Sequence, residues 1–151
     1  MYLCLGISSL PDGVITWVQM DIEDGDSCLD DLVNVTVPIN ERGASGQQYI
    51  EETYGGTPQK YFETWVNGEK GGRYVDLYND GVAYESKVGY TCLSQRVRMQ
   101  ILKDGWLLQN GMVDEVVWVF TESSISGTVG ATQSVFDLLS QYGIHYVVHL
   151  G

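Results

Sequence analysis

Apolar and polar positions alternate along the stretch Arg73–Gly89, which reads R-Y-V-D-L-Y-N-D-G-V-A-Y-E-S-K-V-G. Alternation with a period of two predicts β-strands whose successive side chains point to opposite faces. The two strand-like runs flank Asp80-Gly81, a dipeptide suited to a two-residue type I′ turn because both central positions need positive φ. The pattern therefore predicts a β-hairpin.

The two-residue turn fixes the register of this hairpin. It pairs Tyr78 with Ala83, Leu77 with Tyr84, and Asp76 with Glu85. One face is then expected to be apolar (Val75, Leu77, Val82, Tyr84 and Val88), and the other to carry Asp76, Glu85 and Lys87.

The predicted pair of acids is the unusual feature of the hairpin. Two carboxylates directly opposite each other have Cβ atoms roughly 5 Å apart, which destabilises a hairpin unless a cation lies between them. Hard oxygen ligands suit Mg²⁺, and a metal held by Asp76 and Glu85 with Lys87 beside it is suited to phosphodiester cleavage. The alternative is a solvent-facing hairpin in which Lys87 forms salt bridges with Glu85 or Asp76. The spacing alone leaves both interpretations open.

The rest of the pattern predicts helices and strands in alternation. Ser45-x-x-Gln48 is a capping box for a helix over about 45–54, closed by Gly55. Apolar residues at helical spacing predict a helix over Leu93–Gln109, ended by Gly111. The other expected elements are strand Tyr61–Val66 with a turn over Asn67–Gly72, strand Val113–Phe120, helix Ser134–Tyr142 ended by Gly143, and strand Ile144–Leu150. The order αβββαβαβ from residue 45 predicts an α/β protein with a mixed sheet.

The first forty residues differ from the rest. They contain seven acids and no Lys or Arg, and they predict short strands at Met1–Ser8, Val14–Ile22 and Val33–Val37. We therefore expect two units, an acidic β-rich appendage over 1–40 and the main domain over 41–151. The acids of the appendage either mimic phosphates over a basic site or form a solvated loop.

The charge of the whole chain argues against a nucleic-acid binder. The net charge is −12, whereas such proteins usually carry a basic footprint. Residues 41–151, however, hold thirteen acids and all eight bases, a balance of −5. Five of the bases cluster in sequence around the hairpin: Arg73, Lys87, Arg96, Arg98 and Lys103.

Several other classes of site find little support. Cys4, Cys28 and Cys92 have no metal-ligand spacing, and His145 and His149 on a strand stand roughly 13 Å apart. We expect packing or edge roles for the histidines, and we keep Cys–His catalysis through Cys92 as a weak competitor. No apolar run approaches the roughly 20 residues needed to cross a membrane, and the first ten residues lack the basic start of a signal peptide.

The motif D-x8-E-x-K, formed by Asp76, Glu85 and Lys87, resembles the core of the PD-(D/E)xK, or restriction-endonuclease-like, nucleases. The wider run G-G-R-Y-V-D-L-Y-N-D-G-V-A-Y-E-S-K-V-G-Y-T at 71–91 is similar to nuclease domains at the tips of bacterial polymorphic and contact-dependent toxins. The likeness extends to Y-G-G at 54–56, Q-I-L-K-D at 100–104, V-V-W-V-F at 116–120 and G-I-H-Y-V-V-H at 143–149. One departure is that the first helix reads G-Q-Q-Y-I where such domains often place an acid.

The resemblance implies a restriction-endonuclease-like αβββαβ core and a Mg²⁺- or Mn²⁺-dependent endonuclease acting on DNA or tRNA. Asp76, Glu85 and the backbone carbonyl of Ser86 would hold the metal, and Lys87 would position the attacking water. Gln100 would assist, with Gln95 as a competitor and an amide packed at the helix edge as the alternative. Arg73, Arg96 and Lys103 would contact nucleic acid. It also implies a toxin that acts in the cytoplasm of a target bacterium and is held in check by an immunity protein.

A second hypothesis is a non-catalytic module of the same fold that binds a protein partner through its acidic surface. It is motivated by the net charge of −12 and the weak basic footprint.

Overall fold

The computed structural model of the chain describes the backbone of residues 6–9, 15–18 and 39–150, and the side chains from Ser45 onward. The expected strand over Val33–Val37, the acidic run before it, and Cys4 and Cys28 lie outside the described residues. The elements are β1 (Gly6–Ser9), β2 (Ile15–Val18), α1 (Ile39–Tyr54), β3 (Thr57–Val66), β4 (Glu69–Asn79), β5 (Val82–Val88), β6 (Tyr90–Thr91), α2 (Gln95–Gln109), β7 (Glu115–Thr121), β8 (Gly130–Ala131), α3 (Gln133–Gln141) and β9 (His145–His149).

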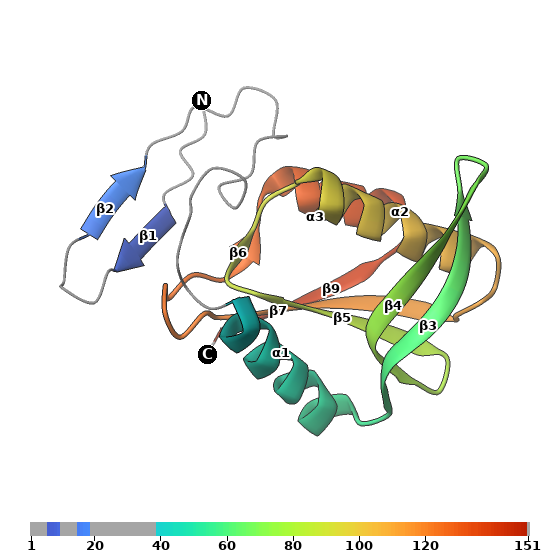
Figure 1. Ribbon diagram of the computed structural model, residues 1–151, viewed down its shortest axis with the longest axis horizontal. Helices are drawn as coiled ribbons and strands as arrows, with labels where there is room; N and C mark the ends of the chain where they lie inside the picture. The colour runs from blue at the N-terminus through green and yellow to red at the C-terminus, as the bar shows by residue number, and fades with distance from the viewer. Residues whose placement is uncertain (1–5, 10–14, 19–38, 151) are drawn as a thin grey trace.

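A five-stranded mixed sheet in the order β3-β4-β5-β7-β9 forms the centre of the fold (Figure 1). The strands β3, β4 and β5 pair antiparallel, whereas β5, β7 and β9 pair parallel. The apolar strand β7 lies between two parallel neighbours, as continuous hydrophobic strands usually do. The prediction of an α/β protein with a mixed sheet is confirmed, and the predicted element order from the first helix onward is found with two short additions. These additions, β6 and β8, pair in parallel as a separate small sheet.

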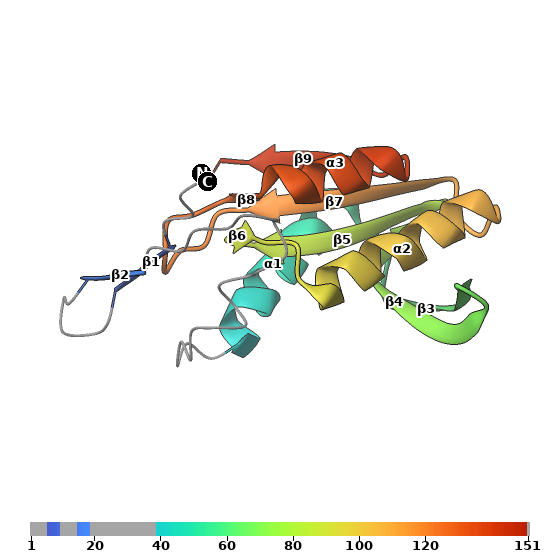
Figure 2. The same cartoon turned by 90° about the horizontal axis from the view of Figure 1, so that it is seen from above.

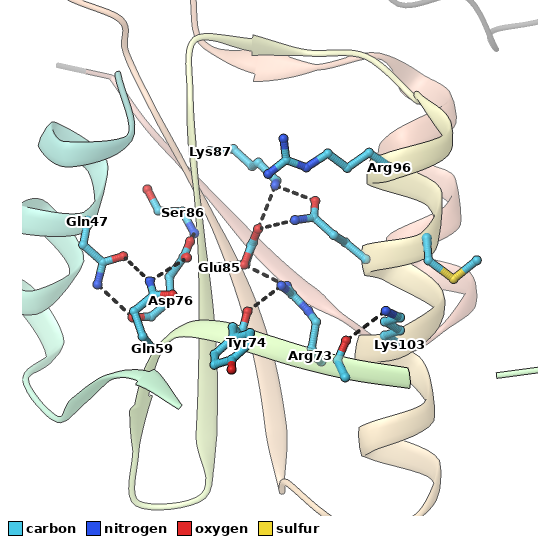
Figure 3. Close-up of a pocket in the computed structure, with 13 residues that line it drawn as sticks. Gln47, Gln59, Arg73, Tyr74, Asp76, Glu85, Ser86, Lys87, Arg96 and Lys103 are labelled. Atoms are coloured by element: carbon cyan, nitrogen blue, oxygen red, sulfur yellow. Dashed lines mark hydrogen bonds and ion pairs between the residues drawn. The ribbon is translucent and has the colours of Figure 1, made fainter. Parts of the chain in front are cut away.

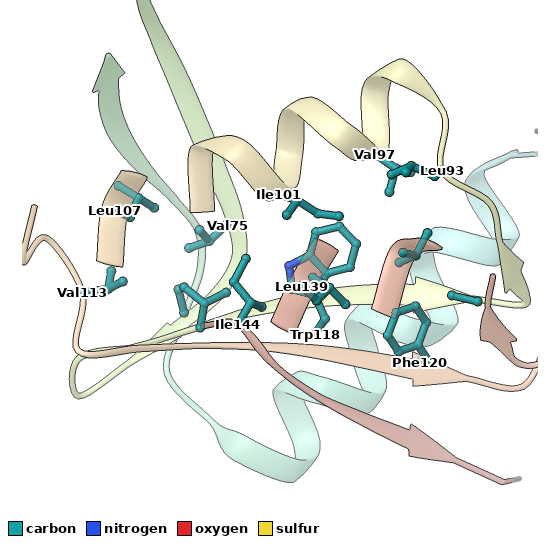
Figure 4. Packing of buried hydrophobic residues seen from close by; sticks show 14 of the residues in the cluster. Val75, Leu93, Val97, Ile101, Leu107, Val113, Trp118, Phe120, Leu139 and Ile144 are labelled. Carbon is teal, nitrogen blue, oxygen red and sulfur yellow. The ribbon is translucent and has the colours of Figure 1, made fainter. Parts of the chain in front are cut away.

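Helices cover both faces of the five-stranded sheet. On one face α1 packs with Ile50 against Leu77 and Val119. On the other face α2 and α3 lie over the larger core, which includes Trp118 and Phe120 (Figures 2 and 4). The glycine inside α2 permits this packing, because a Cβ built on Gly105 would lie 2.5 Å from the ring of Tyr142 at the end of α3.

The central hairpin has the predicted turn and the predicted outer register. Asp80 and Gly81 have φ of 46° and 86°, as a type I′ turn requires. Tyr78 pairs with Ala83 and Leu77 with Tyr84. The expected direct pairing of Asp76 with Glu85 is wrong: the ladder between β4 and β5 ends at Leu77, and the Asp76 carboxylate instead accepts a hydrogen bond from the Ser86 amide at 2.8 Å.

The expected division of the hairpin into one apolar and one charged face is also wrong. Leu77 belongs to the core under α1, but Val75 belongs to the core under α2. Glu85 and Lys87 lie on the α2 side, so helix rather than solvent covers them. The reason is that β4 pairs with β5 only as far as Leu77, and from Val75 back to Glu69 it pairs with β3 alone. The position on β3 opposite Asp76 is Gln59, whose φ of 52° interrupts the β3–β4 ladder.

Three predicted boundaries need correction. The first helix begins at Ile39, so Ser45 lies inside it rather than capping it. Residues 40 and 41 lie in its first turn, and the division of the chain into two units between them stays a prediction. The strand β3 begins at Thr57, and the turn after it is only Asn67-Gly68, with φ of 52° and 77°. The helix α2 begins at Gln95, because the Ser94 hydroxyl caps it by accepting a hydrogen bond from the Val97 amide.

The predicted helix ends are confirmed, since Gly55, Gly111 and Gly143 all have positive φ just past their helices. Within the described ranges, no helix is long and apolar enough to span a membrane.

Candidate active site

One pocket brings together the residues that the nuclease resemblance assigns to metal binding, catalysis and phosphate contact. It has a volume of about 780 Å³ and lies between α1, the β3–β4 strands, β5 and α2 (Figure 3). Its walls include Asp76, Glu85, Ser86, Lys87, Gln100, Arg73, Arg96 and Lys103. Residues from five separate elements therefore converge on one cavity.

Glu85 is the best-supported carboxylate of the pocket, being only 3% exposed. Its Oε1 accepts hydrogen bonds from Lys87 Nζ at 2.7 Å and from Gln100 Nε2 at 3.2 Å, and its Oε2 accepts one from Arg73 Nη2 at 2.7 Å. Burial disfavours the charged form, but Lys87 and Arg73 outweigh it and lower the pKa of Glu85 below its ordinary value. This carboxylate is therefore ionised at neutral pH.

Lys87 is held in a fixed position beside Glu85. Besides its ion pair with Glu85, its Nζ donates to Gln100 Oε1 at 2.8 Å and lies 4.8 Å from the centre of the Trp118 ring. Gln100 thus bridges the lysine and the carboxylate, whereas its competitor Gln95 is exposed and lies outside the pocket. The salt bridge expected for a solvent-facing hairpin does form, but its Lys87 and Glu85 side chains are only 15% and 5% exposed.

Asp76 lies in a different electrostatic environment from Glu85. Its Oδ2 accepts from the Ser86 amide, and Gln59 Nε2 reaches its Oδ1 at 3.4 Å. Burial and the nearby charge of Glu85 raise the pKa of Asp76 to about 6, against the opposing effects of the Ser86 amide, Lys87 and Arg73. The pKa values of the two acids are thus shifted in opposite directions, upward for Asp76 and downward for Glu85.

The buried ion pair behind the pocket was not predicted. Arg73 is 6% exposed, and its Nε donates to Asp104 Oδ1 at 2.6 Å while Asp104 Oδ2 accepts from Trp118 Nε1 at 2.9 Å. The guanidinium of Arg73 is engaged by Asp104, Glu85 and the carbonyl of Tyr74, so the structure gives it a structural role, and its contact with nucleic acid stays a prediction. The signal available in the sequence was an acid on the apolar stripe of α2, three residues after Ile101.

The Arg73 pair shows how strongly these buried charges depend on each other. Desolvation opposes the charge of Arg73, but Glu85 and Asp104 outweigh it and raise its pKa still further. Complete burial raises the pKa of Asp104 above its ordinary value, although Arg73 and the Trp118 N–H act in the other direction.

Arg96 and Lys103 both lie on α2 at the pocket wall, in agreement with their predicted place beside the site. Arg96 is exposed, and Lys103 Nζ donates to the carbonyl of Gly72 at 2.8 Å.

The pocket also contains polar side chains that were not predicted. Gln47 of α1 donates to the Asp76 carbonyl at 2.8 Å, in the helix segment where an acid was expected.

The donor set of the pocket fits a hard divalent cation. A carboxylate offers about four acceptor positions, of which Glu85 uses three and Asp76 two, so both retain capacity for a metal. Mg²⁺ is usually held by one or two carboxylates and keeps several waters. No cluster of three or more His, Cys, Asp or Glu side chains occurs in the described part of the chain. The Ser86 carbonyl as a third ligand stays a prediction.

The histidines and Cys92 lie outside this pocket. His145 Nδ1 is 2.8 Å from Glu115 Oε1, and the ring of His149 stacks on Tyr49. Cys92 is 2% exposed. These positions agree with packing and edge roles for the histidines and give no support to Cys–His catalysis.

Comparisons of the chain with protein-family models, curated proteins and solved structures found no match.

Proposed function

We propose that the chain is a Mg²⁺- or Mn²⁺-dependent endonuclease that hydrolyses phosphodiester bonds of nucleic acid. The observation that carries the proposal is the convergence of Asp76, Glu85, Lys87 and Gln100 in one pocket, with Lys87 Nζ within 2.8 Å of both Glu85 and Gln100. The order α1, β3, β4, β5, α2, β7 supports assigning the core to the restriction-endonuclease-like fold.

The two acids are suited to different tasks. Glu85 is ionised and fixed by three donors, so it offers a charge in a constant position. Asp76 has a pKa of about 6, so a cation that binds there relieves an unfavourable buried charge. A divalent ion held by Asp76 and Glu85 would activate water and stabilise the leaving oxygen.

Lys87 and Gln100 provide the groups that act on water and phosphate. The Lys87 ammonium is oriented by Glu85, Gln100 and the Trp118 ring, so it can donate to a water or a phosphate oxygen without first ordering its flexible stem. Gln100 offers an amide that can exchange its partner Glu85 for that water. Arg96 and Lys103, at the rim on α2, can meet the flanking phosphates.

The similarity of residues 71–91 to toxin nuclease domains supports a biological role as an antibacterial toxin. In that role the chain acts on DNA or tRNA in the cytoplasm of a competitor and is bound by a cognate immunity protein.

The test is cleavage of plasmid DNA and of total bacterial RNA in Mg²⁺ or Mn²⁺, with EDTA in a parallel reaction. We expect cleavage that is lost in EDTA, in Glu85→Gln and in Lys87→Ala. Lys60→Ala is the matched control, because Lys60 is an exposed lysine of β3 outside the pocket. Gln100→Ala should be slowed, whereas Gln95→Ala on the same helix should not. Full activity in both Glu85→Gln and Lys87→Ala would overturn the site.

The pairing of both Glu85 oxygens with cationic side chains favours one alternative, a non-catalytic module of this fold that binds a protein partner. Each Glu85 oxygen already accepts a charged donor, and the chain has a net charge of −12. A folded chain that shows no thermal stabilisation by Mg²⁺ or Mn²⁺, and that binds a protein but no nucleic acid, would support this alternative.

A further inference from the structure

Three large aromatic side chains are exposed on one face of the β3–β4 hairpin. Tyr61, Trp65 and Tyr74 are 48%, 47% and 59% exposed. Tyr61 and Tyr74 are register partners, and Trp65 faces Lys70 across the same two strands. Since residues two apart share a face of a strand, all of these side chains lie on one side. The opposite side carries the buried Phe62 and Val75, so the aromatic face is the one turned away from the core.

The rings of this aromatic face are packed against their own strands. The centroids of Tyr61 and Tyr74 are 4.9 Å apart with an interplanar angle of 52°. The Tyr61 ring lies over Gly72, where an added Cβ would collide with ring atoms. Lys70 Nζ lies 5.9 Å from the centre of the Trp65 ring and 3.0 Å from Glu63 Oε1. The rings are therefore partly pre-positioned while much of their surface is open.

The aromatic face is continuous with the candidate active site. Tyr74 and Gly72 both line the pocket. Asp76 follows Tyr74 by two residues on β4, a distance of about 7 Å along a strand. If one phosphate of a nucleic acid lies at Asp76 and Glu85, the adjacent nucleotide can therefore reach the Tyr74 side chain on β4. Figure 3 shows Tyr74 next to the two acids.

The charge of the molecule decides which form of nucleic acid fits this surface. Binding through a duplex backbone commonly uses about six to ten phosphate contacts. Arg73 is paired with Glu85 and Asp104, and Lys87 is placed at the scissile phosphate, so among the described pocket residues Arg96 and Lys103 are the cations placed to meet flanking phosphates. Two such cations, in a chain of net charge −12, are few for a long duplex backbone. Stacking of bases on aromatic rings does not depend on positive charge, and it requires bases that are unpaired.

We propose that Tyr74 and Tyr61, extended by Trp65, form a stacking surface for unpaired bases next to the scissile phosphate, so that the substrate is single-stranded or looped nucleic acid. This inference rests on the proposed nuclease function for its position at the site. The binding itself needs neither metal nor cleavage.

The experiment measures binding in EDTA, where hydrolysis is absent. Fluorescence anisotropy is recorded at low salt with a short fluorescein-labelled mixed-sequence oligonucleotide as single-stranded DNA, single-stranded RNA and the corresponding duplexes. We expect tighter binding of at least one single strand than of its duplex, and the DNA and RNA arms identify the sugar. Tyr74→Ala and Tyr61→Ala should each weaken that binding by about tenfold or more, since loss of a stacked base has effects of this order.

Two variants separate stacking from a structural effect. Tyr74→Phe keeps the ring and should bind nearly as the unsubstituted chain does. Tyr146→Ala removes a tyrosine of similar exposure, 43%, on β9 at the other edge of the sheet, and should leave binding unchanged. Thermal unfolding of each variant establishes that it is folded at the temperature of the measurement.

The outcomes separate this inference from the proposed function. Equal affinity for duplex and single strand, unchanged binding in both alanine variants, or no binding of a single strand by the folded chain would overturn the stacking surface. Metal-dependent cleavage alongside any of these results would leave the nuclease intact. Ring-dependent single-strand binding without any cleavage would support the stacking surface and overturn hydrolysis.

Discussion

The buried pair behind the pocket gives the sharpest prediction about stability. Asp104 is 0% exposed and accepts from Arg73 Nε at 2.6 Å, from Arg73 Nη2 at 3.1 Å and from Trp118 Nε1 at 2.9 Å. The substitution Asp104→Ala removes all three acceptor contacts at once. It leaves a buried guanidinium with Glu85 and the Tyr74 carbonyl as its partners, and a buried indole N–H without its acceptor.

The size of the loss follows from these contacts. Removing one partner of a buried ion pair costs about 3–5 kcal/mol, because the other charge stays desolvated. Such a loss is roughly a fifth or more of the roughly 5–15 kcal/mol by which a domain is stable. At about 2–4 °C per kcal/mol for a chain of this size, the Tm should fall by about 6–20 °C. Asp104→Asn should cost less, because an amide oxygen can still accept from Arg73 or Trp118.

Urea unfolding followed by circular dichroism measures this loss. Asp137→Ala is the matched control, since Asp137 is an exposed aspartate on α3 and its replacement should change stability by no more than about 0.5 kcal/mol. A double-mutant cycle with Arg73→Met tests the coupling: the double variant should lose less than the sum of the two single variants. A loss below about 1 kcal/mol in Asp104→Ala, or simple additivity in the cycle, would refute this account of the pair.

Three further outcomes are expected. The pKa of Asp76 is about 6 in the folded chain against an ordinary 3.8, so the folded state holds a proton that the unfolded state has released between these values. Stability in EDTA should therefore fall as the pH rises from about 4 to about 6, by at most about 3 kcal/mol, and Asp76→Asn should flatten this part of the Tm profile. Mg²⁺ should raise the Tm at pH 8 more than at pH 5, where Asp76 is protonated, and Asp76→Asn should remove most of the gain at pH 8. An equal gain in Tm at both pH values would contradict the assignment of the metal to Asp76. Gly105→Ala should destabilise the folded chain by about 1–3 kcal/mol despite the better helix propensity of alanine, because the added Cβ meets the Tyr142 ring. Calorimetry that shows a more stable variant would disprove that contact.

The parts of the fold that the sequence predicts well are those governed by local chemistry. The Asp80-Gly81 turn specifies its own backbone angles and hence the pairing of Tyr78 with Ala83. Glycine ends the helices because a positive φ is needed just past them. By contrast, Gly43 and Gly46 lie on either side of Ser45 and weaken the helical pattern there, and this hides the first turns of α1. Gly46 is explained only by the folded state, where a Cβ at this position would collide with the Ser86 and Val88 side chains of β5.

In the candidate site, too, the sequence reveals the local motif but not the residues that support it from distant elements. The acids and the lysine of the motif lie within twelve residues of one hairpin, so their spacing is visible in the sequence. Their supports come from distant elements: Gln47 from α1, Gln59 from β3 and Asp104 from α2. The ion pair of Arg73 is not visible in the sequence, because a positive charge does not reveal its partner and Asp104 lies 31 residues away.

The charge around the pocket also answers the strongest objection to a nuclease. The six charged residues that line it are two acids and four bases, a formal charge of +2, and including the buried Asp104 behind it gives +1. The chain as a whole carries −12. Because a phosphate is attracted by the local potential, and exposed charges farther than about 10 Å are largely screened at moderate salt, the local sum counts for more than the total. A divalent ion at Asp76 and Glu85 would raise that sum by two. The acidity of the whole chain is therefore compatible with a phosphate at this site, and it agrees with the proposal that unpaired bases stack on Tyr61 and Tyr74 rather than that a long duplex backbone is bound.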